Sequence, residues 1–182
     1  MSELPDDVRT RVLREATRLF ARDGVGATSI QDIAQAAGIT RPTLVYHFGS
    51  KEGLRTAVLS TLVDHWSAEL PRLMAQATTG GPSVNSLLRA LFAWFLEDRD
   101  RARLVLREMI DAPEPVRDLV RTRLQPWMRL LSEALRAGQA AGTLRASVDP
   151  EAFILLVVTS GIGVLAAGDR VNALLEPPPE AR

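Results

Sequence analysis

The chain has 182 residues, which suits either one larger domain or a small and a medium one, and 46% of them are hydrophobic. It has no cysteine, which excludes disulfides, thiolate nucleophiles and Cys-ligated zinc and agrees with a reducing, cytoplasmic location. Because 22 basic residues balance 22 acidic ones, the total charge does not predict nucleic-acid binding, and any affinity for DNA has to come from a local face.

Helical spacing of apolar residues recurs along the chain, whereas runs with the alternation of strands are nearly absent. The sequence therefore predicts an all-α protein. The first apolar stripe contains Val12, Ala16 and Leu19, and Asp23-Gly24 is expected to end this helix. Two further short helices are expected before residue 49, so residues 1–49 form a predicted small N-terminal domain.

Residues 28–48 (TSIQDIAQAAGITRPTLVYHF) have the pattern of a helix-turn-helix. Thr28 and Gln31 have capping-box spacing, which predicts a helix start, and Gly38 can adopt the left-handed conformation that ends it. Thr40 can cap a second helix, and Ala34 is the small residue needed where the two helices cross. The same pattern also fits two packed helices in an ordinary bundle.

The second of these helices is the candidate recognition helix, whose first residues would enter the major groove of DNA. Arg41 can donate two hydrogen bonds to guanine, and the hydroxyl of Thr43 can bond to several bases. Pro42 and Val45 can touch the methyl group of thymine. The helix therefore offers polar and apolar groups for direct readout of base edges.

Phosphate contacts are expected next to these groups. Tyr46, His47 and Lys51 suit such contacts, although a half-buried wedge, a surface histidine and a solvated helix start are the alternatives. The predicted DNA-binding residues are Thr28, Ser29, Gln31, Thr40, Arg41, Pro42, Thr43, Val45, Tyr46, His47 and Lys51.

Longer helices are expected in residues 50–176, which form a predicted larger helical domain. Apolar stripes cover residues 84–95 and 116–131, residues 78–83 are a predicted loop, and residues 111–113 separate two helices. Pro71 and Pro126 are expected to kink or break their helices. A connector from Gly142 leads to a last helix that starts at Asp149-Pro150, and residues 177–182 are a predicted disordered tail.

Large apolar side chains are frequent in this second domain. A ligand pocket between helices needs such walls with a few polar groups, and an ordinary core is the alternative. The candidate ligand-binding residues are Trp66, Phe92, Phe95, Arg107, Met109, Trp127 and Met128.

The longest uncharged run, residues 152–168, is only just long enough to cross a bilayer and contains Thr, Ser and Gly, so it predicts a buried helix and no membrane span. A helix without charges at the end of a soluble chain needs a cover, and a two-fold partner is the economical one. The predicted dimer-interface residues are the small ones: Ser160, Gly161, Gly163, Ala166 and Ala167.

Two runs carry a resemblance to a known family. GITRPTLVYHFGSKEGL and, before it, LFARDGVGATSIQDIAQAAG resemble the helix-turn-helix of the tetracycline-repressor (TetR) family, and the likeness extends from Leu13 to Leu59. It implies a homodimeric, ligand-responsive transcriptional repressor that binds an inverted-repeat operator, is released by a small, largely apolar effector and needs no cofactor. One departure is Val45, where family members commonly carry an aromatic residue, usually tyrosine.

Other functional classes have less support. A small-molecule-binding helical protein without specific DNA binding is one alternative, and a lyase or hydrolase that uses a pocket carboxylate is another. G-x-S-x-G, P-loop and H-E-x-x-H motifs are absent, which argues against an enzyme. His65 and Glu69 have the spacing of metal ligands on one helix face, but with only two histidines in the chain we expect no metal site.

Overall fold

The computed structural model describes residues 6–80, 92–111, 114–142 and 144–168, and these ranges contain helices and turns without a strand. Three short helices come first: α1 (Asp6–Asp23), α2 (Ile30–Ala36) and α3 (Arg41–Phe48). The longer elements are α4 (Lys51–Gly80), α6 (Arg99–Asp111), α7 (Glu114–Ala140) and α8 (Pro150–Ala167), and residues 92–97 are also helical. The predicted all-α class is confirmed.

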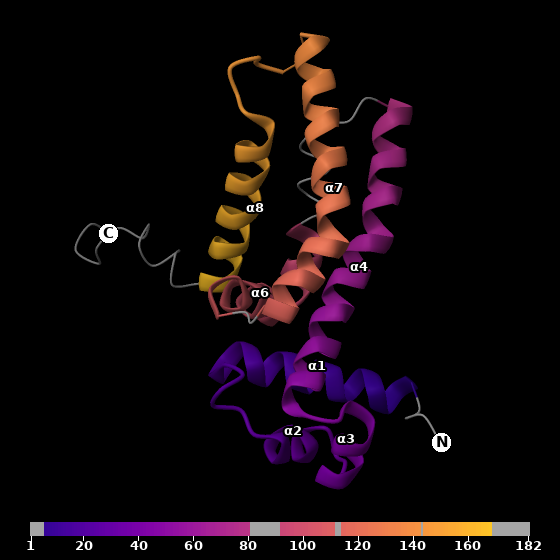
Figure 1. Ribbon diagram of the computed structural model, residues 1–182, viewed down its shortest axis with the longest axis vertical. Coiled ribbons are helices and arrows are strands. Elements are labelled where there is room, and N and C mark those ends of the chain that lie inside the picture. The colour runs from indigo at the N-terminus through magenta and orange to yellow at the C-terminus, as the bar shows by residue number, and fades with distance from the viewer. Residues whose placement is uncertain (1–5, 81–91, 112–113, 143, 169–182) are drawn as a thin grey trace, which may run out of the picture.

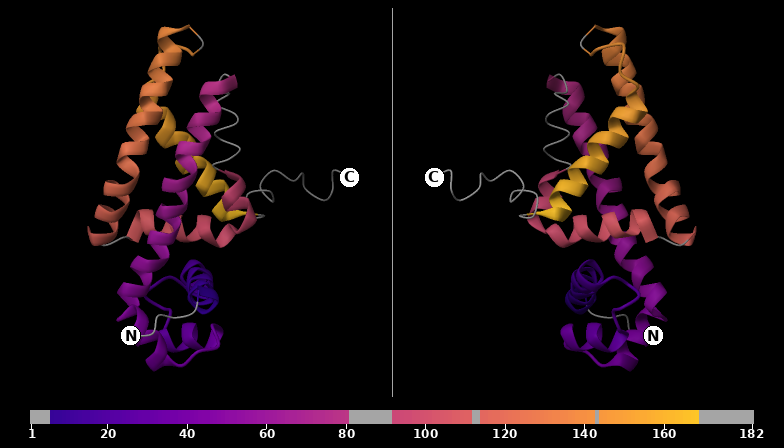
Figure 2. Two further views of the ribbon diagram at one scale, coloured as in Figure 1. Left: turned by 90° about the vertical axis from the view of Figure 1, so that its right-hand side faces the viewer. Right: turned by 90° about the vertical axis from the view of Figure 1, so that its left-hand side faces the viewer.

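The helices form a small head and a larger body (Figure 1). We call α1, α2 and α3 the head, and the helices that follow it the body. In the body α4, α7 and α8 run lengthwise, while α6 lies across their base directly above α1, as the side views show (Figure 2). Helix α6 contacts both α1 and α8, so it is the layer of the body that packs on the head.

Three glycines end helices and Asp149 starts a helix where the sequence predicts them. Gly24, Gly38 and Gly49 have φ of +85°, +67° and +74°, the left-handed region in which residues with a Cβ are strained. Asp149 caps α8 by accepting a hydrogen bond from the Ala152 N–H at 2.8 Å. The turns between the short head helices and the start of α8 thus follow from local sequence alone.

At three places a helix continues where the sequence analysis allows a break. Pro71 lies inside α4 and Pro126 inside α7, so neither proline ends its helix. Each removes one backbone hydrogen bond, a local cost that the packing of a long helix can offset. The predicted loop at residues 78–83 is helical as far as Gly80. Residues 81–91, with most of the predicted stripe at 84–95, and the predicted tail at 177–182 lie outside the described residues.

Two apolar cores hold the molecule together. The head core contains buried side chains from α1, α2 and α3, but also four from α4 (Leu54, Val58, Leu59 and Leu62) and Leu104 from α6. The body core contains Phe95, Ala102, Ile162 and Ala166. Buried apolar surface therefore continues across residue 49, where the sequence places a domain boundary.

Candidate nucleic-acid interface

The turn between α2 and α3 has the geometry of a helix-turn-helix. Ser29 caps α2: its Oγ accepts a hydrogen bond from the Asp32 N–H at 3.1 Å and donates one to the Asp32 carboxylate at 2.6 Å. The cap of α2 is thus one residue later than the predicted cap at Thr28. Leu44 of α3 is fully buried in the head core, so α2 holds α3 in place.

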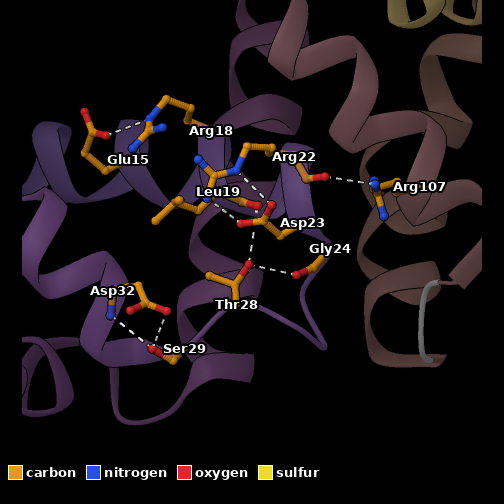
Figure 3. A network of polar contacts seen from close by, with 10 residues as sticks. All are labelled: Glu15, Arg18, Leu19, Arg22, Asp23, Gly24, Thr28, Ser29, Asp32 and Arg107. Atoms are coloured by element: carbon orange, nitrogen blue, oxygen red, sulfur yellow. Dashed lines mark hydrogen bonds and ion pairs between the residues drawn. The ribbon is translucent and has the colours of Figure 1, made fainter.

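The position of Thr28 contradicts its predicted role as a DNA-binding residue. Only 3% of this residue is exposed, and its hydroxyl lies within hydrogen-bonding distance of the carbonyls of Gly24 (2.8 Å) and Leu19 (3.3 Å), as Figure 3 shows. Because Ser29 occupies the capping position, Thr28 turns inward and closes the turn after α1. Its side chain cannot reach DNA.

The start of α3 is held by two threonines. Thr40 caps the helix by accepting a hydrogen bond from the Thr43 N–H at 3.3 Å, and the two hydroxyls share a further hydrogen bond of 2.7 Å. Pro42 lies in the first turn, where a helix needs no N–H from it. The predicted cap at Thr40 is confirmed.

One contiguous side of α3 faces solvent. Arg41, Pro42, Val45 and Tyr46 are exposed there, with Val45 at 36% and Tyr46 at 63%, and we call these four residues the recognition surface. Helical spacing of 100° per residue brings them onto one face, opposite the buried Leu44. Thr43 and His47 are half-buried at its edges, and the rings of His47 and Tyr46 meet edge to face at 4.9 Å.

Lys51 has a structural role that its position in the sequence does not reveal. Its ammonium group donates hydrogen bonds to the carbonyls of Gly26 (3.1 Å) and Thr28 (3.2 Å), which joins the start of α4 to the turn before α2. A lysine has three such donors, so one remains for a phosphate. Ser29 and Gln31 are exposed at the start of α2.

The predicted ligand-binding residues do not converge in the described part of the body. Phe95 is 2% exposed and fills the body core, whereas Met109 is 51% exposed on the surface of α6. Arg107 reaches the head instead, where it donates a hydrogen bond to the Arg22 carbonyl at 3.1 Å. The assignments of Arg107 and Met109 are corrected, because both turn away from the body interior, whereas Phe95 lies in the body core and stays a prediction.

The other four candidate ligand-binding residues remain predictions. Phe92 and Met128 are half-buried, and the ring of Phe92 lies against Gly161 of α8. The side chains of Trp66 and Trp127 lie outside the described residues. Within the described ranges, no group of three His, Asp or Glu residues could hold a metal ion, and His65 stacks on Trp94 at 4.2 Å.

The small residues of α8 divide between two sides of the helix. Ala166 is buried in the body core, and a Cβ at Gly161 would overlap the ring of Phe92, so these two predicted interface residues pack within the chain. Gly163 faces open space, and Ser160 and Ala167 lie on the more exposed side. The sequence prediction missed three exposed large apolar residues of α8: Leu155 (58%), Leu156 (64%) and Val164 (54%).

By length and composition, α8 is also apolar enough to cross a membrane, with a mean hydropathy of 1.9 over Pro150–Ala167. The core helix of a soluble protein passes the same test. Ile154, Ile162 and Ala166 turn one side of α8 into the protein, so only the other side needs a further cover.

Comparisons with known proteins agree with this geometry. The profile of the family described as "Bacterial regulatory proteins, tetR family" matches residues 12–58, and that of the "Tetracyclin repressor-like, C-terminal domain" matches residues 105–170. The HTH-type transcriptional repressor KstR2 of Mycolicibacterium smegmatis is 30% identical over 150 residues, which span 80% of this chain and 71% of that protein. The chain belongs to the tetR family of bacterial regulatory proteins.

Other members extend the likeness of this TetR-family regulator. The repressor DhaR of a Mycobacterium species is 24% identical over 162 residues, or 87% of this chain and 80% of that protein. Among solved structures, GusR of Salmonella enterica has a TM-score of 0.65 at 25% identity and covers 96% of this chain, which in turn covers 90% of GusR. The chain is therefore a helix-turn-helix transcriptional regulator and not an enzyme.

Proposed function

We propose that this regulator is a cytoplasmic, homodimeric repressor that binds an inverted-repeat operator and is released by a small, largely apolar effector. Its two recognition helices read one half-site each. Effector binding in the body favours a spacing of these helices that no longer fits successive major grooves.

The observation that carries the proposal is the recognition surface of α3. Arg41 stands in the first turn of the helix and can donate two hydrogen bonds to a guanine. Pro42 and Val45 provide apolar contact for a thymine methyl group, while Thr43 adds a hydroxyl at the edge. All four side chains belong to a helix that Leu44 anchors in the head core.

Phosphates are bound by the groups around that surface. Ser29 and Gln31 lie exposed at the start of α2, where their side chains can bond to a phosphate. Tyr46 lies on the recognition surface, His47 lies at its edge, and Lys51 has one donor left. These contacts position the head and carry little sequence information.

The second copy of the chain covers the exposed side of α8. Leu155, Leu156 and Val164 are each more than half exposed, although solvent is an unfavourable environment for three large apolar side chains on one helix. Ser160, Gly163 and Ala167 on the same side allow a partner helix to approach closely. The effector site then lies among the body helices, where Phe92, Phe95, Met128, Trp66 and Trp127 are the remaining candidates.

Selection of binding sequences from a random duplex library tests the proposal. We expect an inverted repeat whose half-site centres lie on one DNA face, about one helical turn or a multiple of it apart. Binding without sequence preference would exclude specific recognition by α3. A selected site with a single half-site, bound by one copy of the chain, would exclude the dimeric arrangement but not the reading function.

Release by the effector needs a separate test. Apolar and amphipathic small molecules are added to the protein bound to its fluorescently labelled selected operator, and anisotropy reports release. A compound that releases DNA from the wild type is then tested on Phe92→Ala and Met128→Ala, which we expect to respond more weakly. An unchanged response in both variants would remove these residues from the proposed site.

A further inference from the structure

Helix α6 of the body is attached to the head and to the start of α4 through Leu104, Arg107 and Glu108. Leu104 is 1% exposed and belongs to the head core, together with residues of α1 and α4. One turn later Glu108 faces the same way and is 7% exposed. Between them in the sequence, Arg107 reaches the end of α1. The head is thus completed by a helix that the chain reaches about fifty residues after the head ends.

Glu108 forms a buried ion pair with Arg55 near the start of α4. The Nε of Arg55 lies 3.0 Å from each carboxylate oxygen, and its Nη2 lies 2.8 Å from Oε2. The side chains are 13% and 8% exposed. In every other ion pair between described residues at least one side chain is more exposed than either of these two, and Arg123–Asp64, which also joins two helices, is 50% and 58% exposed.

Arg107 provides a second attachment beside the first. Its Nη2 donates to the Arg22 carbonyl, one of the last carbonyls of α1, which lack partners within the helix (Figure 3). Its guanidinium also lies against Gly24, where a Cβ would come within 3.0 Å of it. Neighbouring residues of α6 therefore hold different elements, Arg107 the end of α1 and Glu108 the first turns of α4, whose Leu54 and Val58 belong to the head core.

Directional and apolar contacts have different consequences at this junction. The apolar contact of Leu104 stabilises burial but tolerates a small rotation of α6, because the hydrophobic effect has no preferred direction. A forked guanidinium–carboxylate pair is strong only in a narrow geometry. A buried pair adds little net stability over apolar residues of the same size, and its better-attested use is to define one arrangement among several.

We infer that Arg55 and Glu108 are positioning residues that set the orientation of the recognition helix relative to the body. This inference rests on the proposed function, because in a dimer that orientation determines the distance between the two recognition helices. The pair joins the segment matched by the tetR-family profile (12–58) to the segment matched by the C-terminal-domain profile (105–170). It therefore connects DNA reading to the ligand-sensing body.

The decisive protein carries the double replacement Arg55→Met and Glu108→Met, and we call it the junction variant. It loses both charges together and gains flexible apolar side chains at the site, so the chain keeps a folded junction without the directional Arg55–Glu108 pair. The matched control is Arg123→Met with Asp64→Met, which removes an exposed pair between α7 and α4. Melting temperatures of both proteins confirm that each is folded under the conditions used.

Head orientation is measured without DNA. The chain has no cysteine, so two introduced cysteines can carry two spin labels in one molecule. The exposed residues Gln35 of α2 and Ala134 of α7 are each replaced by Cys. Labelled protein is diluted with unlabelled protein, and dipolar spectroscopy gives the distance distribution between head and body. We expect a broader or shifted distribution in the junction variant only. A distribution equal to that of the wild type would overturn the inference.

Operator spacing gives the functional readout. The selected operator is compared with versions that have one base pair inserted or removed between the half-sites. We expect the wild type and the control to lose about tenfold or more in affinity for the altered spacings, and the junction variant to lose much less. Equal discrimination between spacings by all three proteins would also overturn the inference. A wild type that selects no sequence would instead contradict the proposed function, and the distance distribution alone would then test head positioning.

Discussion

The guanidinium of Arg11 in α1 donates a hydrogen bond from Nε to the carbonyl of Ala37, 26 residues later, at 2.7 Å. Ala37 is the residue that ends α2, directly before the left-handed Gly38 of the turn. The carbonyls at the end of a helix lack partners within it, and here a side chain of another helix supplies one. Arg11 thus braces the turn that sets α3 against α2.

Replacement of Arg11 by Met tests this brace. Met keeps an apolar stem but cannot donate, so we expect the free energy of unfolding to fall by about 1–3 kcal/mol, as for the loss of a hydrogen bond to a charged group. Arg14→Met is the matched control, because the Arg14 side chain is 67% exposed and pairs only loosely with Glu15. Urea denaturation should leave this control within about 0.5 kcal/mol of the wild type. Equal effects of the two variants would contradict the assignment.

Base reading by Arg41 predicts a change in specificity. Arg41→Ala should cost about 1–3 kcal/mol on the selected operator and relax the preference at one base pair of each half-site. Lys51→Met is the contrast, because the loss of a phosphate contact, and of the two carbonyl contacts that hold the turn before α2, weakens binding evenly across sequences. Binding to a panel of single-base operator variants separates the two patterns. If Arg41→Ala lowers affinity equally for every base variant, Arg41 does not read a base.

Replacement of Val45 by tyrosine is expected to strengthen operator binding. The residue is 36% exposed on the recognition surface and lacks a donor, whereas the tyrosine common in the family has one. We expect Val45→Tyr to bind the operator more tightly and with a steeper dependence on salt if the new hydroxyl reaches a phosphate. Val45→Phe controls for added ring surface alone. No change in affinity or salt slope in either variant would show that position 45 does not face DNA.

Gly163 provides a clean test of the dimer. A Cβ at this position meets nothing within 4 Å in the chain, so Gly163→Arg fits the protomer but places a charge on the side of α8 that we assign to the partner. An unpaired buried charge costs several kcal/mol, so we expect a monomer or an aggregate without operator binding. Ala146→Arg in the exposed connector before α8 should stay dimeric. Sedimentation decides, and a dimeric Gly163→Arg protein with wild-type affinity would exclude this interface.

His65 predicts a small pH dependence of stability. Burial lowers the pKa of His65 from its usual value; the charge of Arg101 lowers it further, and Glu69 and Glu97 raise it. The folded state holds the proton less tightly than the unfolded state does. His65 therefore costs no stability above about pH 6.5, and the free energy of unfolding falls as the pH drops below that value. The difference between wild type and His65→Gln in denaturant titrations from about pH 7.5 to about pH 5.5 isolates this effect. A difference that does not change with pH would contradict it.

Local sequence determined the helix-turn-helix. Gly38 and Thr40 act within a few residues of themselves, the one through backbone conformation and the other through a cap, so their roles could be predicted from the residues alone. The exposed α3 residues follow in the same way, since helical periodicity determines which side chains share a face with Leu44 and which do not. The cap of α2 was predicted one residue early, because Thr28 and Ser29 are both capable caps and only packing chose between them.

Tertiary structure alone decided where residues of different helices meet. Nothing near Glu108 in the sequence indicates Arg55, and nothing near Arg11 indicates the carbonyl of Ala37, because both partners are brought close only by the packing of α1, α4 and α6. The two sides of α8 show the same limit. Its residues are nearly all apolar, so composition could not tell the side of Ala166, which faces the body core, from the side of Leu156, which stays exposed.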